Sequence, residues 1–130
     1  MQVASDPYPK SRQLARGERR YRRKIASPKQ WQAITAAKIG PCRCCGSVCE
    51  YDRLYGLVEY HHVVARVHGG DDVADNIVPV CHDCHDAVTR RDPVAARNLL
   101  ASLDDAEYSY AVTKAGEDYF ERAYGLRYAR

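Results

Sequence analysis

Apolar residues cluster in short runs in the middle of the chain, which is typical of strands. Residues 47–64 (SVCEYDRLYGLVEYHHVV) are rich in Val, Leu and Tyr, and we predict extended strand with a turn, ending at His61 and His62. Residues 76–80 (NIVPV) predict a second short strand. Pro79 indicates a sheet edge, because proline cannot donate a ladder hydrogen bond.

Helix-start signals surround these strands. A helix is predicted from the Ser-Pro pair at 27–28 to the Gly-Pro pair at 40–41. A short helix is expected to begin at Cys84 and His85, and two more follow capping aspartates at 92 and at 104 or 105. The apolar side chains of the last part that are expected to face a core are Val94, Leu99, Leu100 and Leu103. The elements together predict an α+β fold.

Positive charge is concentrated at the N-terminus. Residues 1–30 hold nine Lys or Arg, among them Arg22 and Arg23, and two acidic residues, which gives +7. The whole chain carries +3, so the other hundred residues sum to −4. We expect residues 1–27 to form a basic, flexible arm whose partner is a polyanion, nucleic acid first.

The chain of 130 residues has no apolar run near the ~18 that span a bilayer, and its first residues lack the apolar core of a secretory signal. We therefore expect no membrane association and a cytoplasmic location, where thiols stay reduced. Six cysteines are also too few for a disulfide scaffold. Reduced, paired cysteines favour a metal site.

The cysteines supply two C-x-x-C pairs, Cys42 with Cys45 and Cys81 with Cys84. Two such turns can provide the four-sulfur tetrahedral shell of structural zinc. A redox pair is the rival interpretation, but no βαβ pattern accompanies it. Cys44 and Cys49 are left over and leave an alternative pairing open.

Residues 81–85 also fit C-x-x-C-H, the attachment signature of c-type haem. A haem iron would need a further axial ligand, commonly Met or His. The only methionine is Met1, and no export signal is evident. We therefore expect no haem.

Residues 59–88 (EYHHVVARVHGGDDVADNIVPVCHDCHDAV) resemble the HNH endonuclease motif, and with PCRCCG upstream they resemble its zinc-stapled branch, common in phage and prophage genomes. The resemblance implies a small ββα-metal (His-Me finger) core at 28–92, with a four-Cys zinc site and flanking helices. Residues 93–130 are expected to form a helical extension packed on that core.

The same resemblance assigns roles to individual residues. It implies that His62 is the general base, that His61 and His85 bind a catalytic divalent ion, and that Asn76 pins the loop and orients the base. Many members have Asp where this chain has His61. Two imidazoles without a carboxylate favour Mn²⁺, Ni²⁺ or Zn²⁺ relative to Mg²⁺.

Other polar residues near the motif have two interpretations each. Arg66 and His68 are candidate phosphate contacts, as are Arg22 and Arg23 of the arm, but a solvated loop explains the first two equally well. His82, inside the second cysteine pair, is expected to face solvent.

These features predict a metal-dependent endonuclease that nicks or cleaves DNA with low sequence specificity. The alternative is a non-catalytic zinc module that binds DNA or assists packaging. DNA is the expected partner in both cases, together with phage packaging or recombination proteins.

Overall fold

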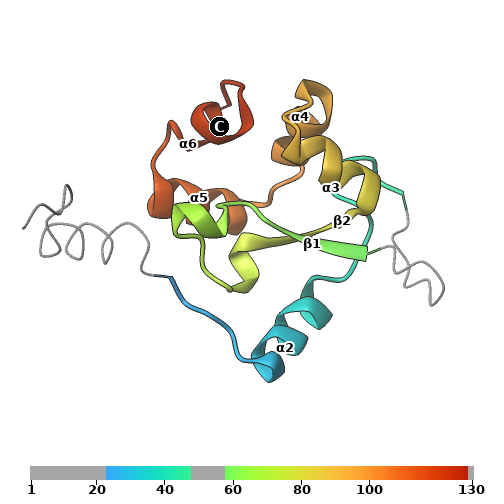
Figure 1. The fold of residues 1–130 in the computed structure, drawn as a ribbon, viewed down its shortest axis with the longest axis vertical. Coiled ribbons are helices and arrows are strands. Elements are labelled where there is room, and N and C mark those ends of the chain that lie inside the picture. The colour runs from blue at the N-terminus through green and yellow to red at the C-terminus, as the bar shows by residue number, and fades with distance from the viewer. Residues whose placement is uncertain (1–22, 48–57, 129–130) are drawn as a thin grey trace, which may run out of the picture.

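The structure is a computed structural model, and it describes residues 23–47 and 58–128. Figure 1 shows their arrangement around a two-stranded sheet. The helices and strands, in chain order, are α2 (Pro28–Lys38), β1 (Val58–His62), the 3-10 turns η1 (Arg66–His68) and η2 (Ala74–Asn76), β2 (Ile77–Cys81), α3 (His82–Thr89), α4 (Pro93–Ala101), α5 (Asp105–Ala115) and α6 (Tyr119–Tyr124).

Strands β1 and β2 pair antiparallel, with Val58 opposite Cys81 and His62 opposite Ile77. Helix α2 lies on one side of the pair and α3 on the other (Figure 1). The strand predicted at 76–80 is confirmed with a shift of one residue, and the predicted end of the first strand at His62 is confirmed. Residues 48–57, predicted as strand and turn, lie outside the described residues.

The helix starts follow their sequence signals. Ser27 and Gln30 form a capping box at α2, and Asp92 caps α4 through the amide of Ala95. Asp104, rather than Asp105, caps α5. Helix α3 begins at His82, two residues before the predicted start, and its cap is the sulfur of Cys81, which accepts the amide of Cys84 at 3.5 Å.

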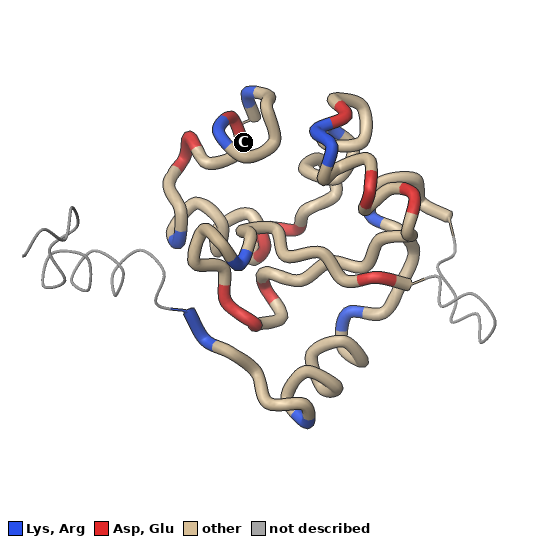
Figure 2. The backbone as a smooth tube through the Cα atoms, in the orientation of Figure 1, with Lys and Arg blue, Asp and Glu red and all other residues tan. Residues whose placement is uncertain are grey.

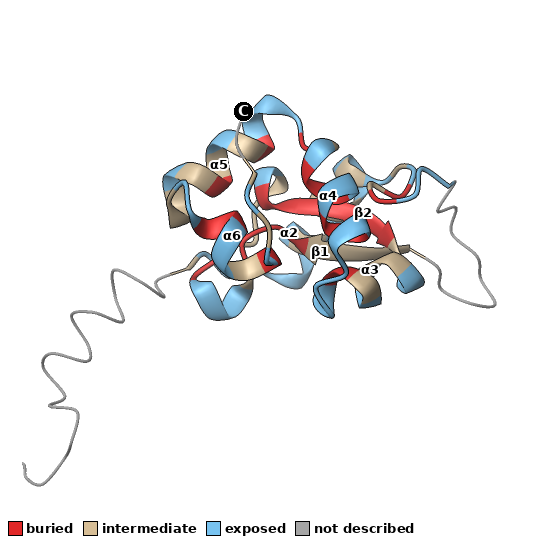
Figure 3. Ribbon diagram, turned by 90° about the horizontal axis from the view of Figure 1, so that it is seen from above, coloured by how far each residue is buried: buried red, intermediate tan, exposed pale blue. Residues whose placement is uncertain are grey.

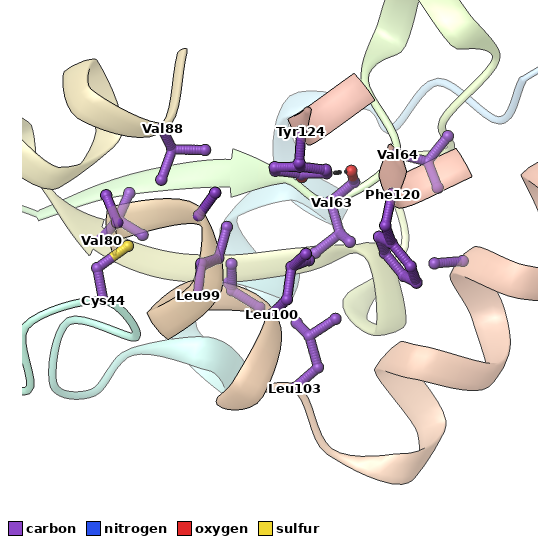
Figure 4. Packing of buried hydrophobic residues seen from close by; sticks show 14 of the residues in the cluster. Cys44, Val63, Val64, Val80, Val88, Leu99, Leu100, Leu103, Phe120 and Tyr124 are labelled. Atoms are coloured by element: carbon purple, nitrogen blue, oxygen red, sulfur yellow. Dashed lines mark hydrogen bonds between the residues drawn. The ribbon is translucent and has the colours of Figure 1, made fainter. Parts of the chain in front are cut away.

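The core lies between the sheet and the C-terminal helices. Figure 3 shows buried residues in β2, α4 and α6, and Figure 4 shows Leu99, Leu100 and Leu103 in the buried cluster. These three positions are buried as predicted, but the expectation for Val94 is wrong. Val94 is 59% exposed because it lies in the first turn of α4, on its outer face.

A buried carboxylate joins three separate parts of the chain. Glu107 of α5 is fully buried and pairs with Lys38 at the end of α2 and with Arg43 next to the first cysteine pair. Arg43 binds it through both terminal nitrogens, at 2.8 and 2.9 Å. Burial raises the pKa of Glu107, but the hydrogen bonds from Arg43 and Lys38 outweigh burial and lower its pKa below the ordinary value.

The last residues of the predicted arm belong to the folded structure. Residues 23–26 run along the loop at 70–72, and Figure 2 shows their positive segment beside a negative stretch of that loop. Residues 1–22 lie outside the described residues. Within the described residues, no helix is long and apolar enough to cross a membrane.

We predict that Glu107→Gln lowers the free energy of unfolding by about 2–3 kcal/mol, because Lys38 and Arg43 lose their shared counter-charge. Since the folded pKa of Glu107 is lowered, its contribution is present above the ordinary glutamate pKa and is lost as the pH falls toward the folded value. Urea unfolding at neutral and acidic pH measures both effects. The exposed Glu117→Gln is the control, and equal losses in the two variants would contradict the prediction.

Candidate active site and metal centre

Four cysteine sulfurs converge at the end of the sheet. The Sγ atoms of Cys42, Cys45, Cys81 and Cys84 all lie within 4.8 Å of one another. Among the residues that the structure describes, they form the only such group of three or more metal-binding side chains. Four thiolates at this spacing are compatible with a tetrahedral zinc site.

Backbone hydrogen bonds set the position of the first pair. The amide of Gly46 donates to the carbonyl of Cys42 at 2.8 Å, which closes the turn, and Gly46 has a positive φ of 73° that suits glycine. The amide of Arg43 donates to the carbonyl of Pro79 at 3.0 Å, which attaches the turn to β2 beside the second pair.

Cys42 and Cys44 are two residues apart but have different surroundings. Burial raises the pKa of Cys42, but amides of Cys45, Cys81 and Cys44 outweigh it and lower the pKa to about 6, which favours the thiolate. Burial raises the pKa of Cys44 to about 12, so its thiol stays protonated. Cys44 packs in the hydrophobic core (Figure 4). Cys49 lies outside the described residues.

Strand β1 presents its side chains alternately to two different surroundings. Glu59 and His61 face α3 and α6, where both approach His85. Tyr60 and His62 face α2, where Trp31 contacts both rings. The pairing register continues through both histidines, so no bulge brings them to one face.

His61 lies against His85 with the ring centroids 5.2 Å apart and nearly perpendicular. Its Nε2 is 2.7 Å from the hydroxyl of Tyr124, and that hydroxyl donates its single hydrogen to the carbonyl of Val63 at 2.6 Å (Figure 4). The hydroxyl can therefore only accept from His61, which places the proton on Nε2 and leaves Nδ1 with a free lone pair. Burial lowers the pKa of His61 to about 3, so the ring is neutral at neutral pH.

Glu59 is a residue of this site that the sequence interpretation missed. Its Oε1 lies 2.7 Å from Nδ1 of His85, and its Oε2 lies 2.8 Å from Nδ1 of His82. The hydrogen bonds from His85 and His82 lower the pKa of Glu59, and the resulting carboxylate only accepts. The Glu59 carboxylate therefore keeps a proton of His85 on Nδ1, and a metal would have to be bound at Nε2.

His62 occupies the other face, where it is 9% exposed. Its ring stacks on Trp31 with an interplanar angle of 9°, and its Nε2 lies 2.8 Å from Oδ1 of Asp72. Burial lowers the pKa of His62 and outweighs the opposite effect of Asp72. The imidazole is therefore predominantly neutral at neutral pH.

Asn76 fixes the loop that follows β1. Its Oδ1 accepts from the amide of Val64 at 2.7 Å, and its Nδ2 donates to the carbonyls of Val64 and Asp71, each at 3.0 Å. The loop leaves no space for a side chain at Gly70, since a Cβ there would lie 1.7 Å from the Val64 carbonyl oxygen. The fully buried Asn76 thus holds the backbone that follows His62.

Residues 42–91 match the family model for HNH endonuclease. This segment of the chain is an HNH domain. Its helix α3 and strands β1 and β2 supply the ββα-metal architecture of the family. HNH domains are nuclease domains that act on DNA and use divalent metals. A search of curated proteins and a search of solved structures gave no match.

Helices beyond the matched segment hold the loop of the HNH domain. Three tyrosine hydroxyls reach it: Tyr124 binds the carbonyl of Val63, Tyr119 accepts from the amide of Ala65 at 2.9 Å, and Tyr110 donates to Asp71 at 2.7 Å. The C-terminal extension therefore supports the site and does more than pack on the core.

The candidate phosphate contacts lie in different surroundings. Arg66 is exposed in η1, close enough for its charge to lower the pKa of His62. His68 is exposed, with Nδ1 3.0 Å from the hydroxyl of Tyr119. Arg23 is engaged by Asp72, while Arg22 lies outside the described residues. His82 is exposed, as expected.

We predict one zinc per chain in the purified protein and its loss in Cys84→Ser, since four sulfur ligands are needed to close the shell. Cys44→Ala is the control, because Cys44 does not belong to the group of four converging sulfurs. Elemental analysis after dialysis measures both. Zinc lost from Cys44→Ala and kept by Cys84→Ser would show that the ligand set is different.

We predict that Tyr124→Phe weakens divalent-ion binding by the HNH domain about 10- to 100-fold, because His61 loses the group that fixes its tautomer. The variant also leaves the Val63 carbonyl without its donor, at a cost of about 1–2 kcal/mol in stability. Calorimetric titration of the zinc-loaded protein with Ni²⁺ or Mn²⁺ measures the affinity. Tyr60→Phe, on the opposite face of β1, is expected to bind like wild type.

Proposed function

We propose that the protein is a metal-dependent endonuclease that hydrolyses phosphodiester bonds of DNA. The observation that carries the proposal is the pair His61 and His85. Each is held by a neighbour through one ring nitrogen, and its other ring nitrogen has no hydrogen-bond partner among residues 23–47 and 58–128. The pair lies within the HNH domain, next to the four-cysteine group, because Cys84 and His85 are adjacent in α3. Neutral imidazoles with a free nitrogen are ordinary ligands of first-row divalent ions.

The donor set fits a divalent ion. His61 would bind it through Nδ1 and His85 through Nε2, with Glu59 as the carboxylate behind His85. A bound divalent ion stabilises negative charge on the scissile phosphate and on the leaving oxygen. Two nitrogen ligands with no direct carboxylate favour Mn²⁺, Ni²⁺ or Zn²⁺ over Mg²⁺.

The remaining residues supply the acid–base and positioning steps. His62 is proposed as the general base, since a neutral imidazole with Nε2 occupied can accept a proton from water at Nδ1. Asn76 keeps the backbone after His62 in place. Exposed Arg66 and the basic residues before position 23 would contact phosphates, and such contacts confer little sequence specificity. A phage origin, with packaging or recombination partners, belongs to the same proposal.

One observation favours a second candidate, a non-catalytic zinc module that binds DNA. Within the described parts of the chain, only the cysteines gather three or more ligands, whereas His61 and His85 provide two. A module of this kind would bind DNA in a salt-dependent way without needing its histidines.

We predict that the zinc-loaded protein nicks or cuts plasmid DNA when Mn²⁺, Ni²⁺ or Mg²⁺ is added. His62→Ala and His85→Ala are each expected to lower the rate about 100-fold or more, because one removes the base and the other a metal ligand. Gel electrophoresis of supercoiled plasmid over time measures the rate.

Asp83→Asn is the matched control, since its side chain is exposed and lies only two residues from His85. It is expected to cleave like wild type. Salt-sensitive DNA binding without cleavage in any metal, unchanged in the histidine variants, would favour the binding module instead.

A further inference from the structure

The contacts of Asp72 connect the N-terminal segment to His62. Oδ1 of Asp72 lies 2.8 Å from Nε2 of His62 and also forms an ion pair with Arg23. Oδ2 accepts a hydrogen bond from the amide of Ala26 at 3.0 Å. Both oxygens are thus engaged. The carboxylate is largely withdrawn from solvent, with its side chain 10% exposed.

Residues 23–26, which we name the N-terminal strap, are fixed on this loop by more than the Asp72 contacts. Arg23 Nε donates to the carbonyl of Gly70 at 2.7 Å, and the amide of Lys24 donates to Asp71 at 2.6 Å. The amide of Asp72 donates in return to the carbonyl of Lys24 at 2.8 Å. The strap is therefore attached to three successive loop residues through backbone and side-chain bonds.

The protonation state of Asp72 determines the tautomer of His62. Burial raises the pKa of Asp72, but the Ala26 amide, His62 and Arg23 outweigh it and lower the pKa. An ionised carboxylate can only accept, so neutral His62 must carry its proton on Nε2. Its Nδ1 is then the atom with the free lone pair. Trp31 stacks on the ring and restricts its rotation.

We propose that Asp72 is a positioning residue that holds His62 in the Nε2–H tautomer, and that the N-terminal strap holds Asp72 in place through Arg23 and Ala26. The inference rests on the proposed function, in which His62 takes a proton from water. Asp72 would also stabilise the imidazolium that forms in that step, as a carboxylate does behind a catalytic histidine. In this proposal Arg23 holds Asp72 in place and does not contact phosphate.

The tautomer is measured by ¹⁵N NMR of the zinc-loaded protein without a second metal, at about pH 8, where free histidine is neutral. The His62 resonances are assigned with His62→Ala. We expect wild type to show Nε2–H and Asp72→Ala to show a mixture of both tautomers. Asp72→Asn keeps the size of the side chain and serves where Asp72→Ala fails to fold. The NH₂ group of the asparagine would have to face one of the groups that donate to Asp72. We therefore expect Asp72→Asn to shift the His62 tautomers in the same direction as Asp72→Ala.

Cleavage kinetics provide the second readout. Asp72→Ala and Asp72→Asn are expected to lower kcat about 100-fold with little change in KM, since substrate binding does not use Asp72. The exposed Asp75→Asn, three residues away, is the matched control for charge. Arg23→Gln is expected to lower kcat less than Asp72→Ala, whereas Lys29→Gln, which removes the same charge from an exposed position, is expected to leave kcat unchanged.

The outcomes separate this inference from the proposed function. An unchanged His62 tautomer in Asp72→Ala, or a kcat equal to that of Asp75→Asn, would overturn the positioning role even though wild type cleaves DNA. If wild type does not cleave DNA, the proposed function fails, and the tautomer measurement alone decides whether Asp72 holds His62.

Discussion

Four cysteine sulfurs fix the point at which strand β2 becomes helix α3, and the geometry of the site depends on that point. Cys81 ends the strand and, through its sulfur, caps the helix that carries Cys84 and His85. The first cysteine pair, Cys42 and Cys45, is attached to β2 through a hydrogen bond from the amide of Arg43. His85 therefore has little freedom relative to β1, where its neighbours Glu59 and His61 lie. A metal bound by these sulfurs would determine the placement of a second metal's ligand without touching it.

The loop between the two strands has no regular structure beyond two short turns, and its rigidity comes from side chains distant in sequence. Asn76 forms hydrogen bonds between the two ends of this loop, and tyrosines of α5 and α6 form hydrogen bonds to it. Buried hydroxyls suit this purpose, since each can accept from one backbone group and donate to another. The HNH domain of this chain is thus incomplete without the helices that follow it, because those helices satisfy backbone groups that the loop exposes.

The parts of the site that the sequence predicted are those whose signals are local. Cys42 with Cys45 and Cys81 with Cys84 are spaced for metal binding, and the caps of α2, α4 and α5 are short-range patterns. Helix α3 was predicted without its sulfur cap, because cysteine is not an ordinary capping residue.

Residues that act through distant partners could not be predicted from one sequence. Glu59 reaches His85 across 26 positions, and Tyr124 reaches His61 across 63. Asp72 is one of two adjacent acidic residues, and Arg23 is one of nine basic residues near the N-terminus, so their pairing is visible only in three dimensions. Val94 was misplaced because apolar character alone does not say which face of a first helical turn is covered.

Because side chains alternate along β1, its pairing register determines the surroundings of Glu59, His61 and His62. Glu59 and His61 face α3 while His62 faces Trp31, and a shift of one residue would exchange these environments. The 14-residue connection from Val63 to Asn76 is too long to fix register as a two-residue hairpin does. The register is instead held by Asn76 at one end of the sheet and by the cysteines at the other. Two histidines adjacent in sequence thus keep separate surroundings because both ends of a five-residue strand are anchored.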